Sequence, residues 1–218
     1  MLPIWLLTVL LILLLSDGKL FTGFRQEPNI GRGIGVGLNE GYTQFLTKRY
    51  FGNDVLESYE FEQAMSELLE LIVGKEKMES LYFNADLFGL IQELKQYYNE
   101  EGIMQFISNM DFLSKFNNDI RFTIAQKEES LKEINIFLLE SYIMKCDYEL
   151  KQNLIDLETF SNKLISFIEM LTIWKMVDNQ GYNYRIAEKI SDLVSQFGIT
   201  VTATVEGELT ISGVSLRR

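Results

Sequence analysis

Residues 61–74, with the sequence FEQAMSELLELIVG, decide the fold class. Apolar side chains recur there at intervals of three and four residues: Phe61, Ala64, Met65, Leu68, Leu69 and Ile72. That spacing places one apolar stripe along an α-helix, and the glycine that follows, Gly74, is typical of a helix C-terminus. The stretch therefore predicts an amphipathic helix that packs its stripe against other elements.

The same spacing recurs along most of the chain. It predicts further helices over residues 39–51, 87–94, 106–113, 120–150, 153–177 and 184–197. Near the end the period changes, because apolar residues alternate with Thr200, Thr202 and Thr204, and Glu206-Gly207 then provides a turn. Such alternation is typical of half-buried strands. We therefore predict a mainly α fold of about seven to eight helices with a C-terminal β-hairpin.

The predicted organisation has four parts. A hydrophobic N-terminal segment covers residues 1–16, a glycine-rich loop 17–38, a helical domain 39–198 and a β-hairpin tail 199–218. In the loop, glycine occupies every second position from Gly31 to Gly37, which matches neither GxGxxG nor a phosphate-binding loop. Alternating glycine instead favours a backbone that bends sharply or approaches another segment closely.

The N-terminal segment is uncharged from Leu2 to Leu15. It is shorter than the roughly 20 residues that a transmembrane helix needs. Three interpretations are open: a membrane anchor, a cleavable signal peptide ending near Ser16 and Gly18, or a buried helix. We favour membrane insertion through residues 2–15, and therefore expect a membrane-associated protein, with a secreted protein as the alternative.

Composition excludes several kinds of chemistry. The 218 residues include no histidine and a single cysteine, Cys146. Within this chain, that excludes a Ser-His-Asp triad, a Cys-His pair, histidine-ligated zinc and an internal disulfide. Cys146 shares an apolar helical row with Tyr142 and Leu150, which favours burial over reactivity. The net charge of −11 argues against nucleic-acid binding, which needs clustered Lys and Arg.

Most of this charge lies between Asp54 and Glu101, where 12 acidic residues are accompanied by three basic ones. One interpretation is a solvated acidic face of the helices. The other is a docking surface for a protein partner on the acidic helices of residues 54–101. The hairpin at residues 199–216 is a second candidate surface, because an isolated hairpin is marginally stable and tends to pack or to pair with another chain.

One segment carries a chemical signature. Residues 37–44, GLNEGYTQ, place Asn39 and Glu40 at the expected start of a helix, with a hydroxyl residue shortly after them. This resembles the Asn-Glu-x-x-Ser/Thr element of the thermolysin-like zinc peptidases, the gluzincins. On this resemblance Glu40 corresponds to the third zinc ligand, and Asn39, Tyr42 and Thr43 support the motif.

The resemblance extends beyond this element. Three further segments are similar in local sequence to zincin-like proteins of low-GC Gram-positive bacteria: residues 29–33, 49–51 and 81–86. The similarity thus covers residues 20–115. The rest of the gluzincin site is missing. In that family an upstream His-Glu-x-x-His helix supplies two zinc ligands and the general base, whereas this chain has the leucine-rich residues 6–15 there. Gln44 also stands where thermolysin has an aspartate.

One glutamate cannot hold a catalytic zinc ion, which needs three protein ligands. We therefore assign no catalytic residue and no cofactor, and we expect zinc only if a His-Glu-x-x-His segment is supplied from upstream. The sequence thus predicts a metallopeptidase-like protein that is catalytically inactive, either a pseudoenzyme or a fragment without its catalytic helix.

The alternative is a membrane-anchored acidic helical interaction module with no enzymatic ancestry. In that case Asn39 is an ordinary helix N-cap, and the Glu40 carboxylate interacts with the helix dipole, a contribution of about 0.3–1 kcal/mol.

Overall fold

The computed structural model describes residues 14–16, 19–27, 33–52, 59–116, 123–171, 182–203 and 209–213. Its helices are α2 (Val36–Phe51), α3 (Glu60–Val73), α4 (Lys75–Phe83), α5 (Leu87–Leu94), α6 (Glu100–Phe116), α7 (Ile124–Lys151), α8 (Leu157–Glu169) and α9 (Tyr182–Val194). Its strands are β1 (Leu14–Ser16), β2 (Lys19–Thr22), β3 (Arg25–Glu27), β4 (Ile199–Ala203) and β5 (Leu209–Gly213). The prediction of a mainly α fold with a C-terminal β-hairpin is confirmed.

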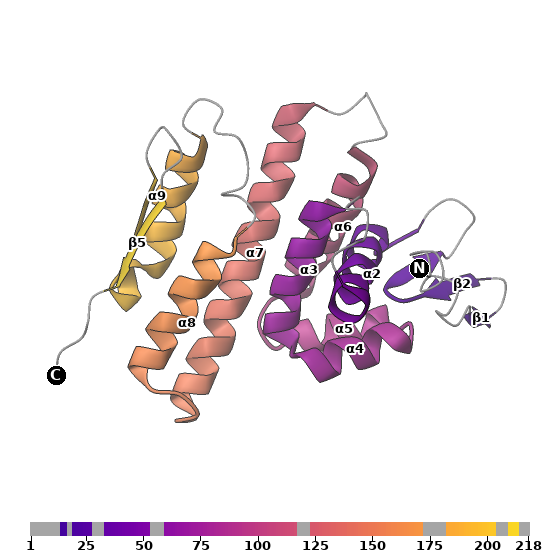
Figure 1. Cartoon of the computed structure of the whole chain (residues 1–218), viewed down its shortest axis with the longest axis horizontal. Helices are drawn as coiled ribbons and strands as arrows, with labels where there is room; N and C mark the ends of the chain where they lie inside the picture. Colours follow the sequence, from indigo (N-terminus) through magenta and orange to yellow (C-terminus); the bar gives the residue numbers. More distant parts are fainter. Residues whose placement is uncertain are drawn as a thin grey trace. The chain divides into compact units, whose positions relative to one another are not determined.

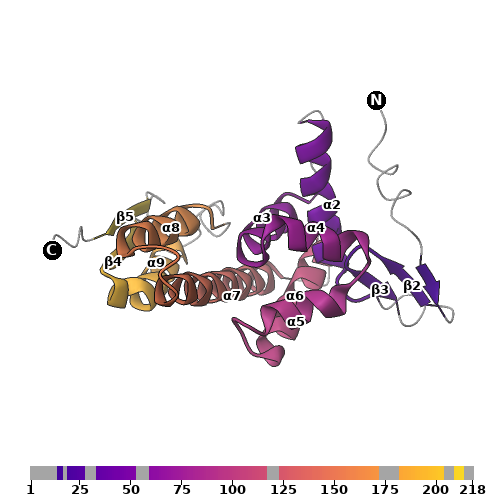
Figure 2. The ribbon, with the colours of Figure 1, turned by 90° about the horizontal axis from the view of Figure 1, so that it is seen from below.

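The chain divides into two compact units, one up to Ile134 and one from Asn135, where the sequence predicted a single helical domain. In the first unit, α2 lies between α3 on one side and the strands β2 and β3 on the other (Figures 1 and 2). Helix α6 also packs against α2. Because α2 has neighbours on several sides, its buried residues include apolar side chains, polar side chains and glycines.

Glycine makes this close packing possible. A Cβ atom on Gly37 would lie 2.0 Å from the carbonyl oxygen of Met110 in α6, and one on Gly41 would lie 2.2 Å from that of Glu62 in α3. Both contacts are with backbone, which cannot move aside as a side chain can. The prediction of sharp bends and close approach is therefore confirmed at Gly37, and at Gly35, whose φ is 76°.

The N-terminal part differs from the predicted loop. Within residues 17–38, strands β2 and β3 form an antiparallel hairpin, and β1 pairs with β2 on the other side. The prediction of a transmembrane helix is wrong: none of the described helices is long and apolar enough to cross a bilayer, and Leu14 and Leu15 lie in β1. Residues 1–13, which carry most of that predicted segment, lie outside the described residues.

Helix boundaries follow local signals in several places. Helix α3 ends at Gly74, as predicted, where φ is 93°. Asp86 is the N-cap of α5, because its side chain accepts a hydrogen bond from the backbone N–H of Gly89. Helix α4 was not predicted. Its residues, KEKMESLYF, carry only a weak apolar stripe, with Met78, Leu81 and Tyr82 as the buried members.

The second unit contains the rest of α7 together with α8, α9 and the β4–β5 hairpin. The rings of Tyr142 in α7 and Phe167 in α8 are stacked with centroids 4.0 Å apart. Cys146, also on α7, is completely buried, and burial raises its pKa to about 11, as expected for a packed thiol. Strand β4 alternates buried and exposed residues, and the backbone N–H of Val201 donates to Ser191 Oγ in α9 at 3.2 Å.

Candidate functional site

Helix α2 carries the motif residues, and it begins earlier than the sequence suggested. Its first residue is Val36, preceded by Gly35 as N-cap. The carboxylate of Asp111, from α6, accepts hydrogen bonds from the backbone N–H groups of Gly35 and Gly37, each at 2.9 Å. These bonds satisfy amides that a helix start leaves without an intrahelical partner. The prediction of Asn39 as N-cap is therefore wrong, and Glu40 lies beyond the first turn.

Asn39 connects α2 to the N-terminal hairpin. Its side chain is almost completely buried, and Oδ1 accepts a hydrogen bond of 3.2 Å from the backbone N–H of Phe24. The residue before Phe24 is Gly23, where a Cβ would be 2.2 Å from Asn39 Oδ1. The neighbouring Asn39 side chain also lowers the pKa of the Glu40 carboxyl group. Asn39 thus holds the turn between β2 and β3 against α2.

Glu40 is half-buried and lies in an environment that disfavours its charge. Burial raises its pKa, while the hydrogen bond from Asn39 and the positive charge of Arg25 in β3 lower it. Glu62, on α3, is 5% exposed, and its pKa is also raised, chiefly by burial. The two carboxylates act on each other, because Glu40 raises the pKa of Glu62 further, whereas Lys127 lowers it.

Two tyrosines lie close to this pair. Burial and then the charges of Glu40 and Glu62 raise the pKa of Tyr59, at the start of α3. Tyr82 in α4 is completely buried, and its pKa is raised by burial, with a smaller contribution from Glu40. Glu40 is therefore the centre of a group of ionisable side chains from α2, α3, α4 and β3.

The remaining motif residues are bound within the protein. Thr43 Oγ1 donates to the carbonyl of Asn39 at 2.6 Å and also shares a hydrogen bond with the Tyr82 hydroxyl. Gln44 Nε2 donates to Gln63 Oε1 at 2.9 Å, and its Oε1 accepts from the backbone N–H of Tyr59 at 3.1 Å. Gln44 thus fixes the start of α3 against α2 with a neutral side chain.

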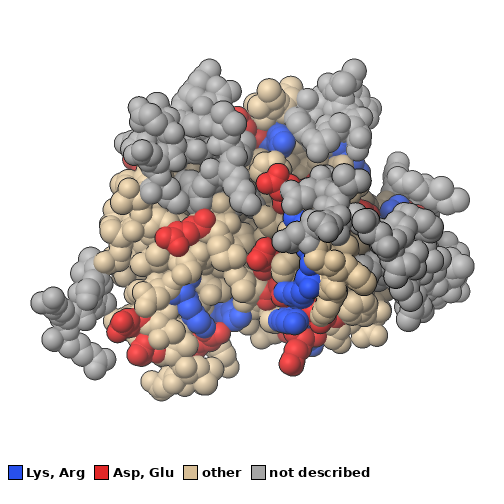
Figure 3. Space-filling view, in the orientation of Figure 1, with Lys and Arg blue, Asp and Glu red and all other residues tan. Residues whose placement is uncertain are grey.

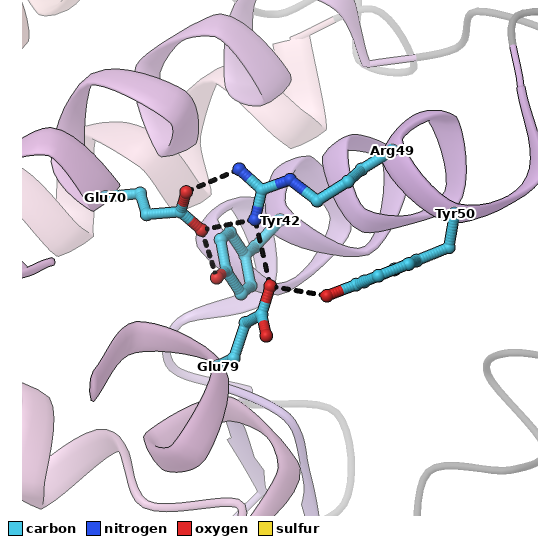
Figure 4. Close-up of polar contacts among 5 residues, drawn as sticks. All are labelled: Tyr42, Arg49, Tyr50, Glu70 and Glu79. Carbon is cyan, nitrogen blue, oxygen red and sulfur yellow. Dashed lines mark hydrogen bonds and ion pairs between the residues drawn. The ribbon is translucent and has the colours of Figure 1, made fainter. Parts of the chain in front are cut away.

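Tyr42 belongs to a separate polar network (Figure 4). Its hydroxyl donates to Glu70 Oε2 at 2.6 Å, and the Arg49 guanidinium binds both oxygens of Glu70 at 2.9 and 2.5 Å. Glu79 Oε1 accepts from Arg49 at 2.9 Å and from the Tyr50 hydroxyl at 2.8 Å. The side chain of Glu70 is 7% exposed. The network joins α2, α3 and α4 and leaves Tyr42 no free hydroxyl for a ligand.

These side chains do not fit a zinc site. In the part of the chain that is described, no three His, Cys, Asp or Glu side chains lie where they could hold one metal ion. Glu40 and Glu62 supply two carboxylates, but the sequence contains no histidine to complete the donor set that the gluzincin resemblance implies. The side chains of Asn39 and Thr43 are already hydrogen-bonded within the fold.

Several acidic residues of the segment 54–101 are buried or paired with a basic side chain. Glu62 and Glu70 are buried. Glu70 and Glu79 pair with Arg49, and Glu93 pairs with Lys77 at 2.8 Å. On the face drawn in Figure 3, acidic and basic atoms lie beside each other rather than in patches of one sign. The predicted docking of a partner on residues 54–101 or on the hairpin at 199–216 stays a prediction.

Several residues of this region were not identified from the sequence. Arg25, Glu62 and Asp111 reach α2 from β3, α3 and α6, and no local pattern connects such distant positions. For the Arg49 network, the sequence contains one indication. Tyr42 and Arg49 are seven residues apart and therefore lie on the same side of a helix. Comparisons of this chain with protein-family models, curated proteins and solved structures gave no match.

Proposed function

We propose that the chain is a metallopeptidase-like protein that is catalytically inactive, derived from the third-ligand half of a gluzincin. One observation carries this proposal. Glu40 is the motif residue that stays half-buried, while Asn39, Tyr42 and Thr43 are buried. A carboxylate placed in this way is what a third zinc ligand requires, and the sequence offers no histidine to complete the site.

The chemistry supports inactivity on a second ground. A zinc peptidase needs a general base to take the proton from the attacking water, in addition to three metal ligands. Glu62, whose pKa the charge of Glu40 raises, is 5% exposed. A side chain so enclosed has no room to act on water and substrate together.

The experiment measures zinc content and peptide hydrolysis on the purified chain. We expect far less than one zinc per chain after dialysis against a zinc buffer, and no hydrolysis of casein or of a mixed peptide library above the buffer rate. Glu40→Gln is the matched control, because it removes the proposed ligand and nearly preserves the side-chain shape. Stoichiometric zinc together with chelator-sensitive hydrolysis, both lost in Glu40→Gln, would refute the proposal.

A further inference from the structure

The C-terminal hairpin is a sheet of two strands, β4 and β5, so each strand has one edge without a neighbouring strand in the described part of the chain (Figure 1). The outer edge of β4 is covered by α9, because the backbone N–H of Val201 donates to Ser191 Oγ in that helix. The outer edge of β5 is therefore the one that has to be examined for a partner.

The hydrogen-bond pattern identifies the backbone groups at the edge of β5. Opposite residues in an antiparallel ladder alternate between pairs that exchange hydrogen bonds and pairs that do not. Val201 is opposite Ile211, and its N–H is bonded to α9, so this pair does not exchange hydrogen bonds. In agreement, the Thr202 hydroxyl donates to the carbonyl of Thr210 at 3.5 Å, so that the residue before Ile211 directs its carbonyl towards β4. The N–H and C=O of Ile211 therefore point away from β4.

The free groups of this edge are arranged symmetrically about Ile211. By the same alternation, Leu209 and Gly213 also direct their N–H and C=O groups away from β4. Within the described residues, the outward groups of these three residues have no hydrogen-bond partner. A second β5, placed antiparallel about a twofold axis at Ile211, would match a donor to each acceptor at all three positions.

The side chains of β5 leave its edge open. The strand, LTISG, contains neither a charged residue nor proline, which are the residues that commonly protect edge strands from pairing. Thr210 and Ser212 are exposed, and antiparallel pairing about Ile211 would set each of them opposite the other in the second copy. A Cβ on Gly213 would lie 3.0 Å from Ile165 Cδ1 in α8, so that helix packs against the face of β5 and not against its edge.

The charges that flank β5 in the sequence favour an antiparallel second copy. Glu206 and Glu208 precede the strand, and Arg217 and Arg218 follow it. Antiparallel pairing directs the acidic end of one copy towards the basic end of the other, whereas parallel pairing would bring like charges together. The edge is thus complementary to itself in both its hydrogen-bonding groups and its flanking charges.

We propose that β5 is a dimerisation edge, at which two copies of this chain pair antiparallel about Ile211 and join their hairpins into one four-stranded sheet. A two-stranded sheet is marginally stable, and two further strands would stabilise it. This interface goes beyond the proposed function and involves neither zinc nor Glu40.

The test is sedimentation velocity of the full chain at increasing protein concentration. The double variant Thr210→Lys/Ser212→Lys places a lysine of one copy directly opposite a lysine of the other, which disfavours pairing. The matched control is Thr200→Lys/Thr202→Lys, which adds the same charges to exposed positions of the same sheet face, but on β4. We expect the wild type and the β4 variant to shift from the mass of one chain towards that of two, and the β5 variant to remain at the mass of one. Circular dichroism checks that both variants are folded.

Disulfide cross-linking tests the register. In the proposed dimer, positions 210 and 212 of different copies are opposite each other in a pair that exchanges no hydrogen bonds, where Cα atoms about 4.5 Å apart allow a disulfide. A mixture of the Thr210→Cys and Ser212→Cys chains should therefore form a cross-linked heterodimer under mild oxidation, and either chain alone should cross-link much less. The wild type, with Cys146 completely buried, gives the background.

A wild-type chain that stays monomeric would overturn the proposal and leave the edge to an extended segment of another protein. A β5 variant that dimerises as the wild type does would place the contact elsewhere and overturn it as well. The same holds if both lysine variants dissociate alike, or if the separate cysteine variants cross-link as well as the mixture. Each of these results is independent of zinc content and peptide hydrolysis, so the dimer and the proposed inactivity can fail separately.

Discussion

At the level of single residues, burial decides which carboxylates destabilise the fold. Glu62 is 5% exposed on α3, close to the charge of Glu40. Lys127 offsets only part of the cost, since the pKa of Glu62 remains above its ordinary value of 4.5. A carboxyl group with a raised pKa prefers to be protonated in the folded protein, so its charged form lowers the free energy of unfolding.

Replacing Glu62 with glutamine should therefore stabilise the protein in a pH-dependent way. The folded state binds the Glu62 proton more tightly than the unfolded chain does. The stabilising contribution of this bound proton to the free energy of unfolding is therefore fully present below pH 4.5. It is lost as pH rises through the folded-state pKa of Glu62. We expect Glu62→Gln to have the higher free energy of unfolding at pH 7, with the difference closing on acidification.

Urea denaturation at a series of pH values measures this difference. Glu76→Gln in α4 is the matched control, because it removes the same charge from an exposed position and should change stability little at any pH. A Glu62→Gln variant that is less stable than the wild type at pH 7, or whose advantage does not vary with pH, contradicts the prediction.

At the level of elements, α2, α3 and α4 are joined by one arginine. Arg49 binds Glu70 through two nitrogens and Glu79 through one, and it stacks over the Phe45 ring at 4.4 Å. The Glu70 side chain is 7% exposed, whereas the Lys77–Glu93 pair that links α4 and α5 is 50% and 31% exposed. Exposed ion pairs contribute little to stability, and a buried charge that loses its partner is costly.

Arg49→Ala should therefore cost roughly 2–4 kcal/mol of unfolding free energy, because Glu70 remains buried with only the Tyr42 hydroxyl as its partner in this network. Lys77→Ala, the control, should cost less than about 1 kcal/mol. Chemical denaturation followed by circular dichroism compares the two. Equal losses in the two variants would show that the Arg49 network is no stronger than a surface pair.

Elements with a strong local pattern were predictable, and elements fixed by distant residues were not. The apolar stripe of α3 and the threonine alternation of β4 both gave the correct structure. The short strands β1 to β3 have too few residues for a period to be recognised, and the leucines of β1 were assigned to a membrane helix. The true start of α2 depends on Asp111, which is 76 residues away from Gly35 in the sequence.

The candidate site shows the same division. The sequence resemblance drew attention to Glu40 and its neighbours because their order along the chain is itself the signal. It could not identify Arg25 or Glu62, since those residues reach Glu40 only when β3 and α3 pack against α2. The distinction matters for function, because no sequence pattern marked the two residues whose charges interact with that of Glu40.

At the level of the whole molecule, a single thiol provides a chemical probe of the second unit. Cys146 is the chain's single cysteine and lies in the second unit, completely buried and with a pKa raised to about 11. A thiol that is both inaccessible and protonated at neutral pH reacts slowly with disulfide reagents. Its labelling therefore reports the opening of the second unit.

We expect the native protein at pH 7 to react with an aromatic disulfide reagent at least about a hundredfold more slowly than the chain in denaturant, since the reaction requires opening of a packed region. Absorbance of the released thiolate gives both rates. A free-cysteine peptide in the same denaturant corrects for the effect of the solvent on the reagent. Comparable rates for native and denatured protein would mean that α7 exposes Cys146 in the folded state.

The glycine at position 41 has a consequence for how relatives of this chain are to be recognised. Any residue with a Cβ there would collide with the α3 backbone, and Asn39 is bonded to the backbone of Phe24, so selection for folding alone is enough to preserve Asn39 and Gly41. Preservation of these two residues in another protein is then evidence of a shared helix crossing. A catalytic zinc site in such a protein has to be inferred from its own histidine ligands instead.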